Sequence, residues 1–556
     1  MSLEPDQESK RLGIVISGSL SKGVEVKLDG SASVEDMAVG RWVTIEGERR
    51  RFFGMITDIS LGVADPQLTI NPPDVSDPFI AEVVSGITVY GNLHVVLQVS
   101  LSGDEASLLQ GPQPVKTVPA HFSVVRTASQ RDVELVFGQE DRERFFIGTP
   151  LDMETKVCLN LPEFVKRSNG IFGKSGTGKT FFTRLLLIGM LQKASAVNLI
   201  FDMHNEYGWS GVSESGHSVK GLKQLGAGFS NVALFTLDEQ SAKRRKVSTD
   251  FVVKIGYDEI EPKDIEILHQ TLNLTEASVQ AVYQLSKEFG EKSWLGKTIA
   301  LKPSKDTEDK DKDSLKDLLG RLNIHESTYQ NLRRGLEKLI RLSFLVPHAP
   351  ENAVQMILGY LNRGTNVVLE FGSYIHSDAA QVLVANLLSR RIYEQYQRLT
   401  EQAQGEGGKS PTHLVIAIEE AHKLLNPEIS QQTIFGTIAR EMRKFNVTLL
   451  LIDQRPSGID QEVMSQLGTK IAFFLDNERD IDSVLAGVSG HNELRSVLSK
   501  LDTKQQFLIF GHAVPMPAVL RTRDYGSTES YRELGLSGTA ELRRKAEQDI
   551  EKLWGN

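Results

Sequence analysis

The residues with the clearest chemistry form one loop, Gly173-Lys174-Ser175-Gly176-Thr177-Gly178-Lys179-Thr180. Its G-x-x-x-x-G-K-T spacing is typical of a loop that wraps the phosphates of a nucleotide. The glycines let backbone N–H groups point inward, and the helix that follows adds the positive end of its dipole. We expect Lys179 to bind the β- and γ-phosphates and the Thr180 hydroxyl to coordinate Mg²⁺. We count Phe181, at the start of the predicted helix, with the nucleotide-binding residues.

Two neighbouring carboxylates, Glu419 and Glu420, follow the apolar run at residues 414–418. In nucleotide hydrolases, the first such carboxylate holds Mg²⁺, and the second orients and deprotonates the attacking water. Strands often end in solvated charges, so the pair gains its meaning from the phosphate loop earlier in the chain. The first carboxylate is more often Asp. The extra methylene of Glu419 leaves its direct contact with the metal open.

Two further polar residues follow predicted strands. Gln454 comes after residues 447–452 and could hydrogen-bond the γ-phosphate and the water, or face solvent from a turn set by Arg455-Pro456. Asp202 follows residues 197–201, where an acid would lie on the ligand side of an open α/β sheet. It could equally cap a loop. His204 is close by, but a zinc site is not indicated because no partner stands at ligand spacing.

Two arginines, Arg440 and Arg443, close the helix predicted before residues 447–452. Basic residues in a last helical turn interact favourably with the helix dipole, which would be enough to explain them. An arginine at this position could instead reach the γ-phosphate of a neighbouring subunit as a finger supplied in trans. For that role we favour Arg443 over Arg440.

An α/β domain must position these residues. Apolar runs without polar alternation predict strands that are buried on both faces of a largely parallel sheet. Helical segments between the strands indicate a layered α/β fold. The runs are residues 197–201, 367–371, 414–418, 447–452, 471–475 and 507–510.

The remaining sequence predicts three further units. Residues 1–120 show short alternating strands typical of a small β-barrel, which we interpret as an assembly or docking module. Residues 251–350 have helical periodicity, and we predict a helical insertion there with a charged loop at residues 302–316. The insertion separates two parts of the core, at residues 121–250 and 351–530. A tail at residues 531–556 contains a predicted amphipathic helix.

Composition limits the classes of function. The chain has 556 residues and a net charge of −9, which argues against a general nucleic-acid-binding coat but allows a local basic channel. No apolar run reaches the ~18 residues that would span a bilayer. The polar start does not resemble a signal peptide. The single cysteine, Cys158, suits a reducing compartment. We therefore expect a cytoplasmic protein with no membrane partner.

The motifs GKSGTGKT, DMHNEYG, VIAIEEAH, REMRKFNV and DQRPS occur in this order. Together they resemble the HerA branch of the HerA/FtsK superfamily. The resemblance implies a RecA-like P-loop ATPase core with an N-terminal small β-barrel and a helical insertion. It also implies ATP and Mg²⁺ as cofactors, and a homohexameric ring that pumps double-stranded DNA. The chain departs from the family pattern at Glu419, Asn205 and Asp453.

Two functions fit this resemblance. In the first, the ring is an ATP-driven translocase that works with a NurA-like nuclease or another effector in DNA end processing or anti-phage defence. In the second, it is a nucleotide-switched scaffold that regulates an effector without processive movement. Stimulation of ATP turnover by duplex DNA would discriminate between them. A secretion-type pump is weakened by the lack of a predicted membrane segment.

Overall fold

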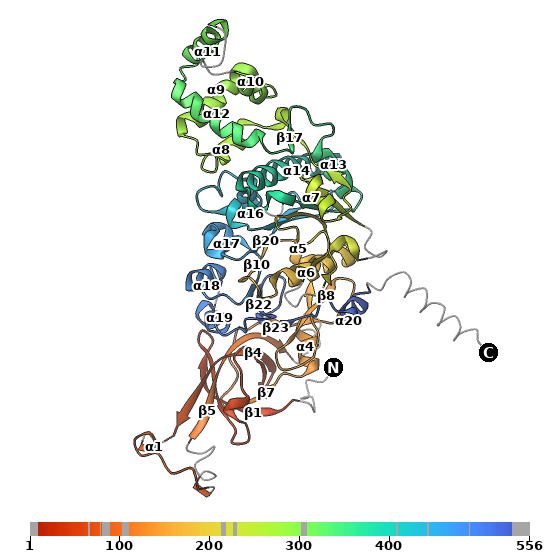
Figure 1. Ribbon diagram of the computed structural model, residues 1–556. Coiled ribbons are helices and arrows are strands. Elements are labelled where there is room, and N and C mark those ends of the chain that lie inside the picture. The colour runs from red at the N-terminus through yellow and green to blue at the C-terminus, as the bar shows by residue number, and fades with distance from the viewer. Residues whose placement is uncertain are drawn as a thin grey trace, which may run out of the picture.

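The chain is arranged as a β-barrel at one end, an α/β core in the middle and a helical projection at the other end (Figure 1). The structure is a computed structural model. It describes residues 9–64, 67–77, 79–80, 89–102, 111–212, 218–225, 231–301, 309–406, 410–441, 444–488 and 490–535. No helix within these ranges is long and apolar enough to cross a membrane.

The N-terminal barrel is closed by antiparallel pairing. Its strands follow the order β2-β1-β7-β3-β4-β5, and β5 pairs back onto β2. Apolar side chains that alternate along these strands, such as Val24 and Val26, form its core. The barrel prediction is therefore confirmed. The strands are β1 (Arg11–Ser19), β2 (Gly23–Leu28), β3 (Trp42–Glu46), β4 (Arg50–Val63), β5 (Val89–Ser102) and β7 (Val124–Thr127).

Strand β7 lies beyond the predicted boundary at residue 120, between β1 and β3. Helix α4 (Gln130–Phe137) follows it and joins the barrel to the core. Arg51 of β4 forms a buried ion pair with Asp132 of α4 at 3.1 Å. The rings of Trp42 and Phe137 stack beside it with centroids 4.9 Å apart. These contacts dock the barrel against the core through buried polar and aromatic groups.

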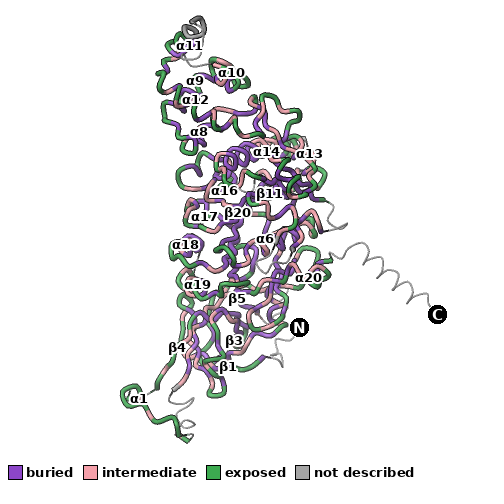
Figure 2. Tube along the Cα trace, viewed as in Figure 1, coloured by how far each residue is buried: buried purple, intermediate pink, exposed green. Residues whose placement is uncertain are grey.

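Twelve strands of the described chain form the central sheet, in the order β15-β14-β18-β11-β19-β20-β10-β21-β22-β23-β8-β9. The strands from β15 to β21 are parallel, and those from β22 to β9 are antiparallel to their neighbours. Figure 2 shows buried residues concentrated along this sheet and the helices that cover it. The strands are β8 (Arg144–Pro150), β9 (Val157–Asn160), β10 (Asn169–Phe172), β11 (Val197–Asp202), β14 (Val232–Thr236), β15 (Phe251–Val252), β18 (Asn366–Glu370), β19 (Leu414–Glu419), β20 (Val447–Asp453), β21 (Thr469–Phe473), β22 (Gln506–Gly511) and β23 (Ala518–Thr522).

All six predicted buried strands are present, with ends shifted by at most two residues. The register sets which residues meet at their carboxyl ends. Phe172 pairs with Asp453, and Ile452 pairs with Glu419. The phosphate loop, the segment after β20 and the paired carboxylates therefore leave the sheet at the same edge. The long helix α14 spans Asp378–Glu406.

The helical projection contains α8 (Pro262–Ile267), α9 (Glu276–Phe289), α10 (Trp294–Ala300), α11 (Asp309–Arg321) and α12 (Glu326–Ile340). The buried Trp294 fixes α10, because its indole N–H donates to the Ile260 carbonyl at 2.9 Å. The region also contains the short strands β15, β16 (Ile255–Gly256) and β17 (Leu345–Val346), which the helical periodicity did not predict.

Two other predictions need correction or lie outside the described residues. The predicted loop at residues 302–316 is wrong from Asp309 onward, because α11 begins there. Leu315, Leu318 and Leu319 are buried, and they anchor a helix whose first half reads as polar. Residues 302–308 are outside the described ranges. So is the predicted tail helix from residue 536 onward; the described chain reaches α20 (Thr528–Glu533) and two further residues.

Candidate active site

The phosphate loop joins β10 to helix α6 (Lys179–Lys193). Gly176 and Gly178 have φ angles of 80° and 99°, which side-chain-bearing residues rarely adopt. Gly178 caps α6 without a side-chain hydrogen bond, and the first turn carries no acid. The N–H groups at this helix start are therefore suited to an anion that approaches from the loop.

The loop is anchored from both sides. The Gly173 N–H donates to the Asp453 carbonyl at 3.2 Å, and the Thr177 hydroxyl donates to the Lys174 carbonyl at 2.8 Å. The Lys174 ammonium pairs with Asp476 on the surface, so its side chain is already engaged in an ion pair. Thr177 is buried, whereas Ser175 and Gly176 are exposed. The predicted nucleotide-binding loop thus offers its backbone and keeps one lysine, Lys179, for the site.

Lys179 is buried at the first position of α6, with 8% of its surface exposed. Burial lowers the pKa of its ammonium, and the nearby carboxylates Asp453, Glu419 and Glu420 oppose that shift. The predicted lysine and paired carboxylates are therefore close enough to interact electrostatically. Thr180 and Phe181 follow in the same helical turn, and both are half-buried.

Glu419 ends β19 with a buried carboxylate. Its Oε2 accepts a hydrogen bond from the His204 backbone N–H at 3.2 Å and lies 3.4 Å from Nδ1 of the same histidine. This contact raises the pKa of His204 above its usual value. Thr180 and Glu419 offer only oxygen atoms, the ligand type that Mg²⁺ prefers, so the residues present fit the predicted ion.

Glu420 has φ 50°, an unusual value for a residue other than glycine. Such strained positions persist only when the surrounding contacts hold them, and they gather at active sites. The Gln454 side-chain amide lies 3.4 Å from Oε1 of Glu420, as a donor. The structure therefore brings the predicted base and the predicted γ-phosphate sensor together.

Asp202 is fully buried at the end of β11. Its carboxylate accepts hydrogen bonds from the three backbone N–H groups of residues 206–208, at 2.7, 2.8 and 3.1 Å. Burial and the charges of Glu419 and Glu370 raise its pKa above the usual value. This geometry favours the loop-capping role of Asp202 over the predicted contact with the nucleotide.

The two candidate finger arginines stand at and just beyond the end of α16 (Ile434–Glu441). Arg440 is exposed in the last turn of α16, which leads into β20. Strand β20 then runs ~20 Å to the edge that carries the phosphate loop. Arg440 thus lies toward the opposite edge of its own sheet. Arg443 lies outside the described residues.

Two residues that the motifs did not assign, His422 and Asp453, also lie in the site. Asp453 accepts hydrogen bonds from the backbone and ring of His422. Burial alone would raise the pKa of Asp453, but His422 holds it below the usual value. Burial alone would lower the pKa of His422, but Asp453 raises it overall. The only hint in the sequence was that Asp453 departs from the family pattern.

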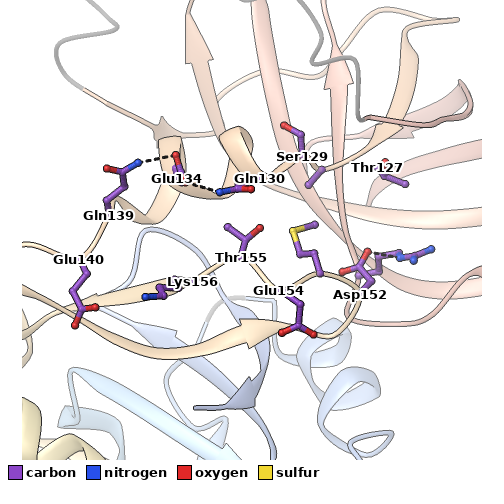
Figure 3. A pocket seen from close by; sticks show the side chains of 13 residues that line it. Thr127, Ser129, Gln130, Glu134, Gln139, Glu140, Asp152, Glu154, Thr155 and Lys156 are labelled. Carbon is purple, nitrogen blue, oxygen red and sulfur yellow. Dashed lines mark hydrogen bonds and ion pairs between the residues drawn. The ribbon is translucent and has the colours of Figure 1, made fainter. Parts of the chain in front are cut away.

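A separate cavity of about 670 Å³ lies between the barrel and the core, beside α4 (Figure 3). Several of its polar side chains pair with one another. The Gln130 and Gln139 amides donate to Glu134 at 3.1 and 2.9 Å, and Arg41 pairs with Asp152 at 2.6 Å. Different elements form this cavity and the phosphate-loop edge. The chemistry described above belongs to the sheet edge.

Comparison with known families agrees with this arrangement. Residues 145–392 match the family described as the central domain of the helicase HerA, and residues 12–78 match the HAS barrel domain. In both regions the chain is similar to the HerA family. Its fold is the RecA-like P-loop ATPase core of that family, with the N-terminal barrel and the helical insertion, and it is an ATP-hydrolysing enzyme.

Curated HerA proteins are similar over most of their length. The DNA double-strand break repair helicase HerA of Sulfolobus acidocaldarius is 25% identical over 94% of this chain and 97% of its own. The protein of the same name from Saccharolobus solfataricus is 25% identical over 87% of both chains. Among solved structures, the bacterial conjugative coupling protein TrwBdeltaN70 aligns with a TM-score of 0.45 and 10% identity, over 72% of this chain and 94% of that one.

The phosphate loop offers a matched pair of lysines for a binding test. Lys179→Ala should weaken ATP binding by about 100-fold or more, because it removes a buried cation from the β/γ-phosphate position. Lys174→Ala should change binding less than about threefold, since that side chain already pairs with Asp476 at the surface. Titration with a fluorescent ATP analogue measures both. Equal losses in the two variants would contradict the assignment of Lys179.

Proposed function

We propose that this HerA-like ATPase is a motor that moves along double-stranded DNA as a homohexameric ring. The relatives named above are DNA repair helicases that align with nearly the whole chain. The observation that carries the proposal is the common edge of β10, β20 and β19, where Lys179, Gln454 and the Glu419–Glu420 pair leave the sheet together. That edge carries the groups needed for hydrolysis of ATP.

Each group has a separate task in the proposed reaction. The loop N–H groups and Lys179 bind the phosphates, and Thr180 and Glu419 hold Mg²⁺. Bound there, the ion supplies positive charge to the β- and γ-phosphates. Glu420 takes a proton from the attacking water, and Gln454 hydrogen-bonds the γ-phosphate and that water. The products are ADP and inorganic phosphate, with the proton held on Glu420.

The ring completes the site. Because Arg440 lies toward the opposite edge from its own phosphate loop, we propose that an arginine after α16 acts on the neighbouring subunit. Arg443 remains preferred over Arg440 for this role. Closure and release of the subunit interface with each ATP would move DNA-contacting loops along the duplex backbone.

The remaining assignments are also proposals. We divide the chain into a docking barrel (1–120), an ATPase core in two parts (121–250 and 351–530), a helical insertion (251–350) and a tail (531–556). The barrel would receive an effector, either a NurA-like nuclease in DNA end processing or another effector in anti-phage defence. The alternative is a ring scaffold that regulates such an effector without moving along DNA.

Glu420→Gln tests the chemistry directly. The amide cannot take the proton of the water, so ATP turnover should fall by about 100-fold or more while ATP binding is kept. The exposed Glu462→Gln serves as the matched control and should turn over normally. In wild-type protein, duplex DNA should stimulate turnover, as measured by phosphate release. Normal ATP hydrolysis by Glu420→Gln would contradict the assignment of Glu420 as the base. ATP turnover that does not change when duplex DNA is added would favour the alternative of a regulatory ring scaffold.

Mixed rings test the finger in trans. Rings made only of Arg443→Ala subunits or only of Glu420→Gln subunits should be nearly inactive. At equal mixing, about one quarter of the interfaces join an intact Glu420 to an intact Arg443, and independent sites would recover up to that fraction of activity. Co-expression with two tags proves the mixing, and Arg440→Ala in the same protocol compares the two arginines. Recovery with neither arginine variant would contradict a finger in trans from independent sites.

A further inference from the structure

A single buried carboxylate joins the three segments of the active-site edge. Both oxygens of Asp453, which is fully buried at the end of β20, accept hydrogen bonds. Oδ2 accepts the His422 backbone N–H at 2.7 Å, and Oδ1 accepts the Arg455 backbone N–H at 2.6 Å. The carbonyl of the same residue accepts the Gly173 N–H of the phosphate loop. Asp453 therefore fixes the turn after the paired carboxylates relative to the loop.

The ring of His422 is held by the same group. Its Nδ1 lies 3.0 and 3.2 Å from the two oxygens of Asp453, so a proton on Nδ1 is shared with that carboxylate. The same Nδ1 lies 3.6 Å from Oε2 of Glu420. Gln454 lies on the other oxygen of Glu420, Oε1. The Glu420 carboxylate thus has the Gln454 amide as a donor at Oε1 and the His422 ring beside Oε2, beyond hydrogen-bond distance.

A bound metal ion is the alternative explanation for the close approach of these side chains. Glu420, His422 and Asp453 place possible ligand atoms within 4.8 Å of one another. Both Asp453 oxygens, however, already accept backbone N–H donors, and Nδ1 of His422 points at the same carboxylate. An ion here would have to displace those bonds inside a buried site, which is costly. A hydrogen-bonded couple accounts for the geometry without one.

We propose that His422, held by Asp453, is a positioning residue for Glu420. It keeps the Glu420 carboxylate turned toward the attacking water, so that the proton passes from the water to Glu420 as the water oxygen bonds the γ-phosphorus and the bond to ADP breaks. The backbone supports this role. Glu420 has a strained φ of 50°. His422 stands two residues after it, and the backbone and ring hydrogen bonds of His422 to Asp453 hold that turn in place.

This inference rests on the proposed hydrolysis by Glu420, and variants of His422 test it. His422→Ala should lower kcat for ATP by about tenfold or more, with KM and the affinity for a non-hydrolysable ATP analogue changed less than about threefold. His422→Asn places an amide donor near the position of Nδ1 and should recover at least about a third of the lost kcat. His512→Ala, at a surface pair with Glu163, is the matched control and should leave kcat unchanged.

Three further measurements make the outcome decisive. Thermal unfolding should show the same midpoint for His422→Ala and His422→Asn, so that their difference in kcat reports positioning. Asp453→Asn should lower kcat in the same way as His422→Ala. Added to Glu420→Gln, His422→Ala should cause no further loss of residual turnover, because it acts through Glu420.

Several results would overturn the inference. A kcat for His422→Ala within twofold of wild type would do so, as would equal losses in His422→Ala and His422→Asn, which would indicate a structural role. An additional loss in the Glu420→Gln background would show that His422 acts elsewhere. Failure of the proposed function looks different: Glu420→Gln itself would then hydrolyse ATP normally, whatever the His422 variants do.

Discussion

Strand β20 lies between the strand of the phosphate loop and the strand of the paired carboxylates, and its hydrogen bonds to both set their relative height. This register is the constraint on which the active site depends. Because Phe172 is level with Asp453, and Ile452 with Glu419, the loop and the carboxylates emerge at one edge. A slip of one residue in β20 would turn its buried side chains to the other face and separate Gln454 from Glu420.

Charge balance is the second requirement of that edge. Glu419, Glu420 and Asp453 surround one buried lysine, and Asp202 and Glu370 lie one and two strands further along the same edge. Four of these acids are held by N–H donors or by an arginine: Asp202, Asp453 and Glu419 accept backbone bonds, and Glu370 pairs with Arg245. Glu420, the proposed base, keeps 17% of its side chain exposed, so water can reach its carboxylate.

Much of this arrangement could be predicted from local sequence. The phosphate loop and the buried strands follow from glycine spacing and from apolar runs, which depend on neighbouring residues alone. The contacts of His422 with Asp453 could not be predicted in this way, because they depend on the register of strands separated by some thirty residues of chain. The sequence left two roles open for Asp202, contact with the nucleotide or capping of a loop, and the positions of its neighbours favour capping.

Local composition also gave the wrong secondary structure where tertiary packing determines it. The charged start of α11 reads as a loop until its three leucines are seen to be buried. The short strands β16 and β17 are two residues each, too short to leave a periodic signal, and they pair only because the chain returns beside itself after the insertion. The identity of the finger arginine depends on a second chain, which no pattern within one chain specifies.

We propose that ATP hydrolysis at this edge drives movement along a duplex. Displacement of a third DNA strand from a triplex tests it most directly, because no base pair of the underlying duplex needs to be opened for release. Release should require ATP and an intact Glu420, with a lag that lengthens as duplex is added between the entry end and the third strand. ATP turnover stimulated by DNA without any release of the third strand would contradict it.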